Sequence, residues 1–224
     1  MTTNFGTKDG ILIRVMTKDD LRIIENSIYD EEPLQLALVG NSKAQMHQSL
    51  IEILDKFHNS MVEQGTCLVA INEKDGERIV GCILAGCETS DDLQEYHAQI
   101  STLDECAFKT VGIFECETKI KVNYFQYYSV SKVIYAAMIN VDASMRGRGL
   151  RARLANVLKE LGRSKGFKVI KAWSSSFYSA RQMEGVGMEC IYRQPYADYK
   201  DAKGQVIFKP PALHSELRIS ALKL

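Results

Sequence analysis

One stretch in the middle of the chain constrains the fold more than any other. The apolar run 133–141 is typical of a buried strand, and it leads directly into a turn of glycines and arginines, Arg146–Arg151. A helix is expected next, because apolar residues recur at spacings of three and four, at positions 150, 154, 157, 158 and 161. Glycines let the backbone approach a ligand, and the first helical turn has free N–H groups. The stretch therefore predicts a site for a phosphate-bearing molecule.

Positive charge gathers around this turn. Nine basic side chains stand against two acidic ones between residues 142 and 171, whereas the whole chain is balanced at 28 against 28. That overall balance argues against nucleic acid as a partner. We interpret the lysines beyond residue 158 as a solvated helix face, and Arg146, Arg148 and Arg151 as phosphate contacts. The turn matches neither the P-loop pattern nor the dinucleotide pattern, which disfavours both of those sites.

Length and composition indicate one ordinary globular domain over residues 1–224. The chain is 46% hydrophobic and 25% charged, and it is long enough to bury a substantial core. Its beginning lacks a signal-peptide pattern and no apolar run reaches the roughly 18–20 residues that cross a bilayer, so we expect a cytoplasmic protein without a membrane partner. The six cysteines form no C-x-x-C pair and the four histidines are scattered. We therefore expect reduced thiols and no metal site.

Hydrophobic periodicity and turn residues predict the remaining elements, and their order indicates a single α/β domain with a mixed sheet. A hairpin is expected where a polar loop that contains a glycine, 72–77, joins two apolar runs. Strands are expected at 11–16, 67–71, 79–85, 133–141, 167–173, 188–192 and 206–208. Helices are expected from Thr17 to about 29–32, at 43–64, within 90–129, from 150 to just before Gly166, and at 178–186.

The turn also carries a family resemblance. Arg146-Gly-Arg-Gly-Leu-Arg151 resembles the [Gln/Arg]-x-x-Gly-x-[Gly/Ala] loop of the GNAT superfamily of acetyl-CoA-dependent N-acetyltransferases. Within that superfamily the chain is similar, over nearly its whole length, to the insect arylalkylamine (dopamine-type) N-acetyltransferases. The stretches that carry this similarity are Asp30-Glu-Glu-Pro-Leu34, Ser175-Ser-Phe-Tyr-Ser-Ala-Arg181, Tyr196-Ala-Asp-Tyr199 and Val206-Ile-Phe-Lys-Pro210. The main departure is Arg151, which stands where the loop pattern has a small residue.

The resemblance implies a GNAT-like fold, in which a mixed central sheet is flanked by helices and two neighbouring parallel strands splay apart. Acetyl-CoA would be the co-substrate, with its pantetheine arm in the gap between those strands. Ile139, Asn140 and Val141 would form strand-like hydrogen bonds with that arm. The diphosphate would rest on the turn, which consists of Arg146, Gly147, Arg148, Gly149, Leu150 and Arg151.

The same resemblance implies acetyl transfer to the primary amine of an arylalkylamine of the dopamine, tryptamine, serotonin or histamine type, by direct attack on the thioester and in a monomer. Such an amine has a pKa of about 10 and arrives protonated, so a base must remove its proton. Glu32 matches the family's proposed base, and Ser175 and Ser179 match two serines proposed to move protons with it. Tyr178 is an alternative acid. The structural alternatives are a solvated acid before Pro33 and serines that cap a helix.

Two other functions remain open from the sequence. The same machinery could acetylate a polyamine, a hydrazine or a peptide amine. Alternatively, the chain could be a CoA-binding module with weak catalysis, and Arg151 is the residue that favours this second alternative.

Overall fold

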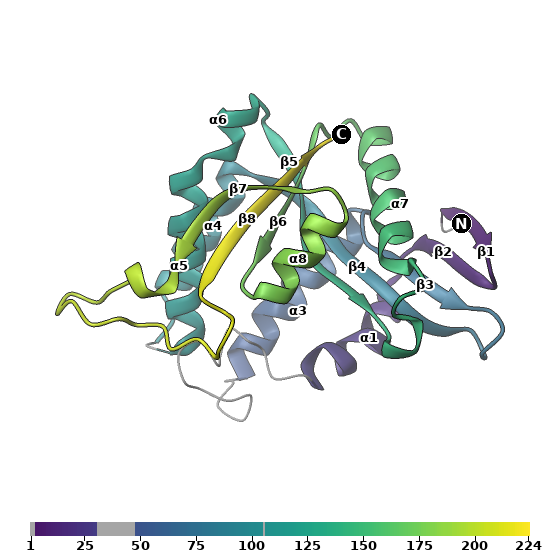
Figure 1. Ribbon diagram of the computed structural model, residues 1–224, viewed down its shortest axis with the longest axis horizontal. Helices are drawn as coiled ribbons and strands as arrows, with labels where there is room; N and C mark the ends of the chain where they lie inside the picture. Colours follow the sequence, from purple (N-terminus) through teal and green to yellow (C-terminus); the bar gives the residue numbers. More distant parts are fainter. Residues whose placement is uncertain (1–2, 31–47, 105) are drawn as a thin grey trace.

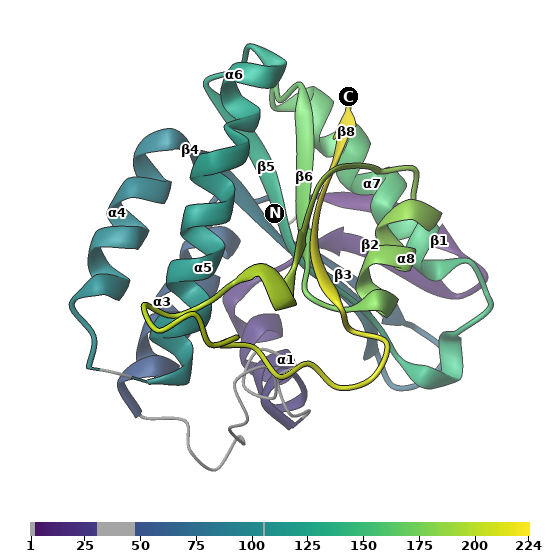
Figure 2. The same ribbon diagram turned by 60° about the vertical axis from the view of Figure 1, so that its left-hand side comes forward.

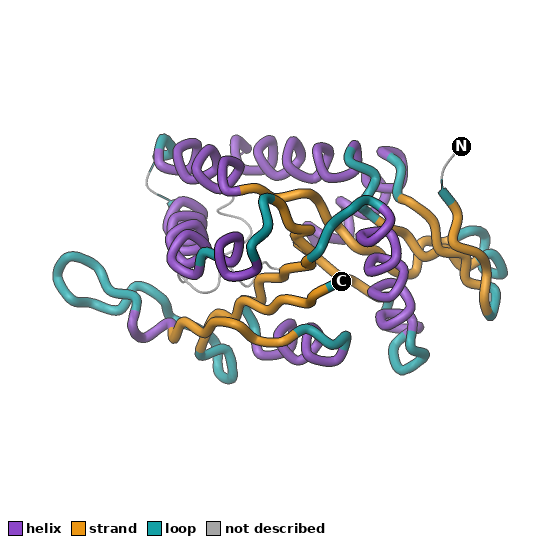
Figure 3. The backbone as a smooth tube through the Cα atoms, turned by 90° about the horizontal axis from the view of Figure 1, so that it is seen from above, coloured by secondary structure: helices purple, strands orange, loops and turns teal. Residues whose placement is uncertain are grey.

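The computed structural model describes residues 3–30, 48–104 and 106–224, and these form one mixed sheet between two layers of helices (Figure 1, Figure 3). Eight strands lie in the order β1-β2-β3-β4-β5-β6-β8-β7. Neighbouring strands are antiparallel except β5 and β6, which run parallel. The mixed α/β sheet expected from the sequence is thus confirmed.

The elements follow the chain in an order close to the expected one. The strands are β1 (Asn4–Lys8), β2 (Ile11–Val15), β3 (Leu68–Asn72), β4 (Arg78–Thr89), β5 (Lys132–Val141), β6 (Val169–Ser174), β7 (Glu189–Pro195) and β8 (Glu216–Lys223). The helices are α1 (Lys18–Asp30), α3 (Gln48–Glu63), α4 (Ser90–Ser101), α5 (Ala107–Val122), α6 (Tyr124–Tyr128), α7 (Leu150–Ser164) and α8 (Phe177–Gly185), with short 3-10 turns η2 (Ala143–Met145) and η3 (Tyr196–Asp198). The expected start of the second helix, 43–47, lies outside the described residues.

The two faces of the sheet are covered by different helices (Figure 2). On one face, Leu154 and Leu158 of α7 are buried in one cluster with Ala136 of β5, as the 3–4 spacing predicted. On the other face, Leu21 of α1 and Met61 of α3 pack in a second cluster with strand residues of the opposite parity. The core is therefore split into two layers by the sheet.

Thr17 caps the start of helix α1, as expected. The Thr17 hydroxyl accepts a hydrogen bond from the Asp20 N–H at 3.2 Å, and the Asp20 carboxylate accepts one from the Thr17 N–H at 2.7 Å. Arg14 of β2 holds the same carboxylate at 2.6 Å. Helix α4 begins at Ser90, within the expected range 90–129, because Thr89 forms the reciprocal cap with Asp92.

The parallel strands β5 and β6 pair over three residues only. Ile134, Tyr135 and Ala136 lie opposite Ile170, Lys171 and Ala172, and no pairing continues beyond them. β5 nevertheless runs on to Val141, paired only with β4 on its other side, and Figure 1 shows the two strands diverging there. The register between β4 and β5 shifts by one residue at Ala137, which is a β-bulge that bends β5 at this position. We call the position after Ala136 and Ala172 the parting point.

One expected strand is wrong. Residues 206–208 are not a strand; only Val206 forms an isolated bridge, with Lys200. The apolar character of this segment has another cause, since Phe208 is buried against Phe114 of α5 and Tyr196. The strand that completes the sheet is β8, which lies between β6 and β7 and alternates polar residues with the buried Leu217, Ile219 and Ala221. Residues 201–204 form a turn, in which the Gly204 N–H donates to the Asp201 carbonyl.

Candidate functional site

The turn between β5 and α7, here called the glycine loop (residues 146–151), has the geometry of an anion cradle. Gly147 and Gly149 adopt left-handed backbone conformations, with φ of 76° and 72°. Among the described residues, no protein acceptor binds the N–H groups of Gly147 or of residues 149–152. Open space surrounds both glycines, since a Cβ on either would meet no atom within 4 Å. A helix start with free amides and a clear approach fits a diphosphate.

Charge in the glycine loop favours the same ligand. Arg146 and Arg148 are exposed, and no ion pair recorded for the described part of the chain involves them or Arg151. The nearby Asp142 does not compensate them, because its carboxylate accepts bonds from Ser144 and lies 2.7 Å from Arg78. Those partners lower the pKa of Asp142 to about 2. The loop thus presents uncompensated positive charge to solvent.

Arg151, the departure from the family pattern, is half-buried and turned toward α8. With its side-chain amide oriented to accept, Gln182 of α8 takes hydrogen bonds from both terminal nitrogens of Arg151, at 3.2 and 3.3 Å. The Arg151 Nε is buried and has no hydrogen-bond partner among the described residues. Burial, and then the charge of Arg146, lower the pKa of the guanidinium. Arg151 therefore connects the two helices that follow β5 and β6, and its backbone N–H remains free.

The β5 residues proposed to pair with pantetheine lie beyond the parting point. Ile139 is half-buried, Asn140 is exposed and Val141 is buried. Because they pair with β4 on one side only, the backbone groups directed away from β4 are available to a ligand. The carboxyl ends of parallel strands lie at the same end of a sheet, so this segment shares its end with the residues that follow β6.

The serine-rich segment after β6 separates the two serine candidates. Ser176 caps α8, and Ser179 completes the reciprocal cap: the Ser179 Oγ accepts from the Ser176 N–H at 3.2 Å and donates to its carbonyl at 3.0 Å. The Ser175 hydroxyl is half-buried and makes no recorded hydrogen bond within the described residues, while its carbonyl accepts one from the Tyr196 hydroxyl at 2.7 Å. The free hydroxyl belongs to Ser175.

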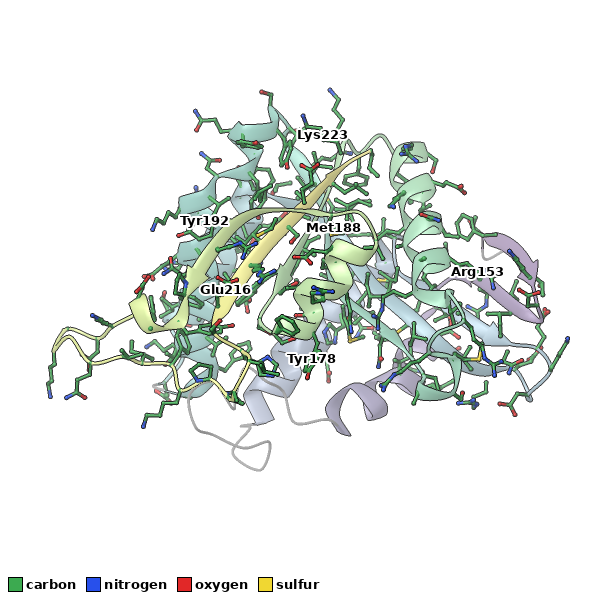
Figure 4. All side chains as sticks on the ribbon, in the orientation of Figure 1. Arg153, Tyr178, Met188, Tyr192, Glu216 and Lys223 are labelled. Carbon is green, nitrogen blue, oxygen red and sulfur yellow. The ribbon has the colours of Figure 1, made fainter. Side chains whose placement is uncertain are left out.

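Aromatic side chains surround the start of α8. Tyr178, labelled in Figure 4 at the beginning of this helix, is exposed, and its ring lies 5.8 Å from that of His214. The Nδ1 of His214 accepts a hydrogen bond from the Phe177 N–H at 3.2 Å, which joins the β7–β8 loop to the helix. Sequence patterns did not single out His214, Gln182 or Ser176 as neighbours of the site. For Ser176 a signal existed in its serine three residues later, which is a helix-capping spacing.

Glu32, the expected base, lies outside the residues that the structure describes. Among the described residues, the glycine loop, the unpaired part of β5 and Ser175 follow the carboxyl ends of two parallel strands and so lie at the same end of the sheet. They contain no group of three or more His, Cys, Asp or Glu side chains arranged to hold a metal ion. No helix among them is long and apolar enough to cross a bilayer.

No family model matches the chain, but solved structures resemble it over almost its whole length. A mosquito arylalkylamine N-acetyltransferase-like protein (like 5b) is 26% identical, with a TM-score of 0.80 over 96% of this chain and 100% of its own. The Drosophila melanogaster polyamine N-acetyltransferase, which forms N-acetylagmatine, is 25% identical, with a TM-score of 0.81 over 96% and 100%. Arylalkylamine N-acetyltransferase 2 from Aedes aegypti, at 23% identity over 96% and 99%, has a TM-score of 0.80 and shares the fold. The resemblance read from the sequence is confirmed: this chain has the fold of the GNAT superfamily and is similar to the insect arylalkylamine and polyamine N-acetyltransferases.

Proposed function

We propose that this chain is an N-acetyltransferase that moves an acetyl group from acetyl-CoA to the primary amine of a small arylalkylamine. The observation that carries the proposal is the unpaired part of β5 beside the glycine loop. Backbone groups that lack a strand partner suit an extended, amide-containing arm, and the free amides next to them suit a diphosphate. Acetyl-CoA has both parts and supplies the acetyl group as an activated thioester.

Three groups of this chain would then act on the reaction. Glu32 removes a proton from the alkylammonium, whose pKa of about 10 keeps it protonated at neutral pH. The amine nitrogen forms the new bond to the acetyl carbon as the carbon–sulfur bond breaks. Backbone N–H groups of β5 beyond Ala137 stabilise the carbonyl oxygen as it gains negative charge. Ser175 donates a proton to the departing sulfur and takes in its place the second proton that the nitrogen loses on acylation; Tyr178 is the alternative donor.

We prefer direct transfer to a cysteine acyl-enzyme, and the three buried cysteines among the six agree with this preference. Burial raises the pKa of Cys67, Cys82 and Cys116 to about 12, so these thiols carry almost no thiolate at neutral pH. A buried thiol is also out of reach of a bulky thioester. These three side chains therefore suit the core better than the chemistry.

A panel assay tests the proposal. Release of CoA thiol would be followed with tryptamine, dopamine, serotonin and histamine beside agmatine, spermidine, a hydrazine and a peptide amine. We expect the highest kcat/KM for an arylalkylamine. Preference for agmatine or a polyamine would instead assign the chain the substrate class named for the similar Drosophila enzyme. Acetyl-CoA binding by calorimetry without turnover of any amine would instead favour the CoA-binding module, with Arg151 as the first residue to revert to glycine.

A further inference from the structure

Four charged side chains that the proposed chemistry does not use lie together between the sheet and α5, three of them buried and Glu115 half-buried. They are Glu88 of β4, Lys171 of β6, and Glu115 and Lys119 of α5. The expectation of a solvated helix face is wrong for Lys171, which lies in β6 and has no exposed surface; Lys119 retains 3%. Figure 2 shows α5 and α6 lying over the strands concerned. Buried charges at this density need an explanation, because each loses its hydration.

The cluster neutralises itself. The Lys171 Nζ lies 2.8 Å from one carboxylate oxygen of Glu88, and the Lys119 Nζ lies 3.2 Å from the other. Lys119 also lies 2.5 Å from Glu115, and the Tyr124 hydroxyl donates to Glu88. Two ammonium groups thus face two carboxylates, so no external ion is required.

Its position in the sheet is next to the parting point. Lys171 is the register partner of Tyr135, and the next pair, Ala136 and Ala172, is the last before the strands separate. The Lys171 Nζ lies 3.8 Å from the centre of the Tyr135 ring, and the Tyr135 hydroxyl donates to Glu115 at 3.2 Å. Cation–π and ionic contacts therefore tie this pair to β4 on one side and to α5 above.

Stability alone does not account for such a cluster. Apolar side chains of similar volume often stabilise a core as well as a buried ion network does, or better, because the ions lose so much hydration. What the network adds is directional contact: Lys171 has to lie within reach of both Glu88 and Tyr135. A ladder of only three residue pairs, whose strands could gain further hydrogen bonds by pairing longer, needs such a constraint on its register.

We propose that Lys171 is a positioning residue for acetyl-CoA: with Glu88 and Tyr135 it fixes where β5 and β6 part and so holds residues 137–141 open for the cofactor arm. This inference rests on the proposed function. It assigns to the buried cluster a role in cofactor affinity, which a purely stabilising ion network would lack.

The protonation of Lys171 adds a consequence. Burial lowers the pKa of Lys171 to about 7, although Glu88 opposes the shift. Lys119 contacts two carboxylates, and they outweigh its burial and raise its pKa. Lys119 and Lys171 hold the pKa of Glu88 at about 2 despite burial. The other titratable groups that face the cluster, whose pKa values burial raises, stay neutral: Tyr96, Cys116, Tyr124 and Tyr135. Lys171 is thus the member that titrates near neutrality.

The test compares acetyl-CoA dissociation constants, by calorimetry at pH 6.5, with thermal midpoints for the same proteins. The double variant Glu88→Gln/Lys171→Met removes one charge of each sign and leaves the Lys119–Glu115 pair and an acceptor for Tyr124. We expect its dissociation constant to rise about tenfold while its Tm stays within a few degrees of wild type. Lys171→Arg, which keeps the charge, should bind within about threefold of wild type. The control Lys18→Gln/Glu63→Gln removes an exposed ion pair that lies 2.6 Å apart, and should change neither quantity.

Unchanged affinity in Glu88→Gln/Lys171→Met overturns the inference and leaves the proposed function intact. Absence of acetyl-CoA binding in the wild type overturns both. If the double variant does not fold, Tyr135→Leu decides: it removes the ring that lies 3.8 Å from the Lys171 Nζ and the hydroxyl that donates to Glu115, so the dissociation constant should rise several-fold, and unchanged affinity overturns the inference.

Discussion

The two ends of the β5–β6 pair handle charge in opposite ways. At the closed end, Lys171 and its neighbours are buried, and every charge has a partner within 3.2 Å. At the open end, Arg146 and Arg148 are exposed without an ion pair in the described structure, and the N–H groups of Gly147 and of residues 149–151 have no acceptor there. Charged groups whose partners lie within the protein hold the fold in place, whereas charged groups and amides without such partners can bind a ligand. The distinction lies in partners rather than in the kind of residue, since both ends are rich in basic side chains.

The largest effect expected at the open end concerns Glu32. Glu32→Gln should lower kcat/KM by about 10²–10⁴-fold, because the amine would lose its base. Kinetics from pH 6 to 9 with the preferred amine would measure it, and Glu31→Gln is the matched control. Near-wild-type activity of Glu32→Gln across that range would remove Glu32 from the role.

Ser175 and Ser179 allow a second comparison, because the hydroxyl of Ser175 makes no hydrogen bond among the described residues and that of Ser179 is hydrogen-bonded in the α8 cap. Ser175→Ala should lower kcat by about 10²-fold, at the low end for general acid catalysis, since a thiolate leaves readily. Ser179→Ala should instead lower the free energy of unfolding by about 1 kcal/mol through loss of the α8 cap, with little change in kcat. Single-turnover rates and thermal melts on both variants separate these outcomes. The opposite result would make Ser179 the proton donor.

A single substitution in the glycine loop should have a smaller effect, on acetyl-CoA affinity alone. Gly149→Ala places a side chain at φ 72°, which costs about 1–2 kcal/mol in the left-handed region, so acetyl-CoA affinity should fall about tenfold. Gly185→Ala is the control, because Gly185 is not in that region and its Cβ would also meet open space. Equal affinities for the two variants would show that the loop does not need its conformation to bind.

The smallest expected effect concerns Lys171, at the closed end, and the pH dependence of the free energy of unfolding. The folded pKa of Lys171, about 7, lies below its ordinary value of 10.5. Above pH 7 the unfolded chain therefore binds more protons than the folded one, and the free energy of unfolding should rise with pH. Denaturant titrations between pH 7 and 8.5 would show a shallower rise in Lys171→Arg, whose guanidinium stays charged. Parallel slopes would mean that Lys171 does not titrate in this range.

Local patterns predicted the elements on which the site is built. The apolar run, the two glycines and the 3–4 spacing after them placed β5, the glycine loop and α7 correctly, because each depends on neighbours in sequence. The same reasoning failed at 206–208, where Phe208 owes its apolar neighbours to α5, far away in the chain. Strand β8 was missed for a different reason: its Leu217, Ile219 and Ala221 alternate with polar residues, which is a local strand signal that the prediction overlooked.

The site residues also differ in whether local sequence or a distant segment determines their position. Arg146 and the glycines could be recognised from spacing, whereas the direction of Arg151 depends on Gln182 in another helix. Glu88, Lys119 and Lys171 come from two strands and a helix, and each looks like an ordinary surface residue in sequence. They meet because β4 and β6 lie on either side of β5 and α5 packs over them.

The bulge at Ala137 gives this sheet two inner edges besides the outer ones on β1 and β7. An exposed strand edge is usually a liability, because a strand of another chain can pair with it and start aggregation. Here the inner edges converge at the parting point and extend only over residues 137–141 and 173–174. A whole β-strand would find few partners in so short a space. Unpaired backbone can therefore be kept ready for a slender ligand with little risk of capturing a neighbouring protein.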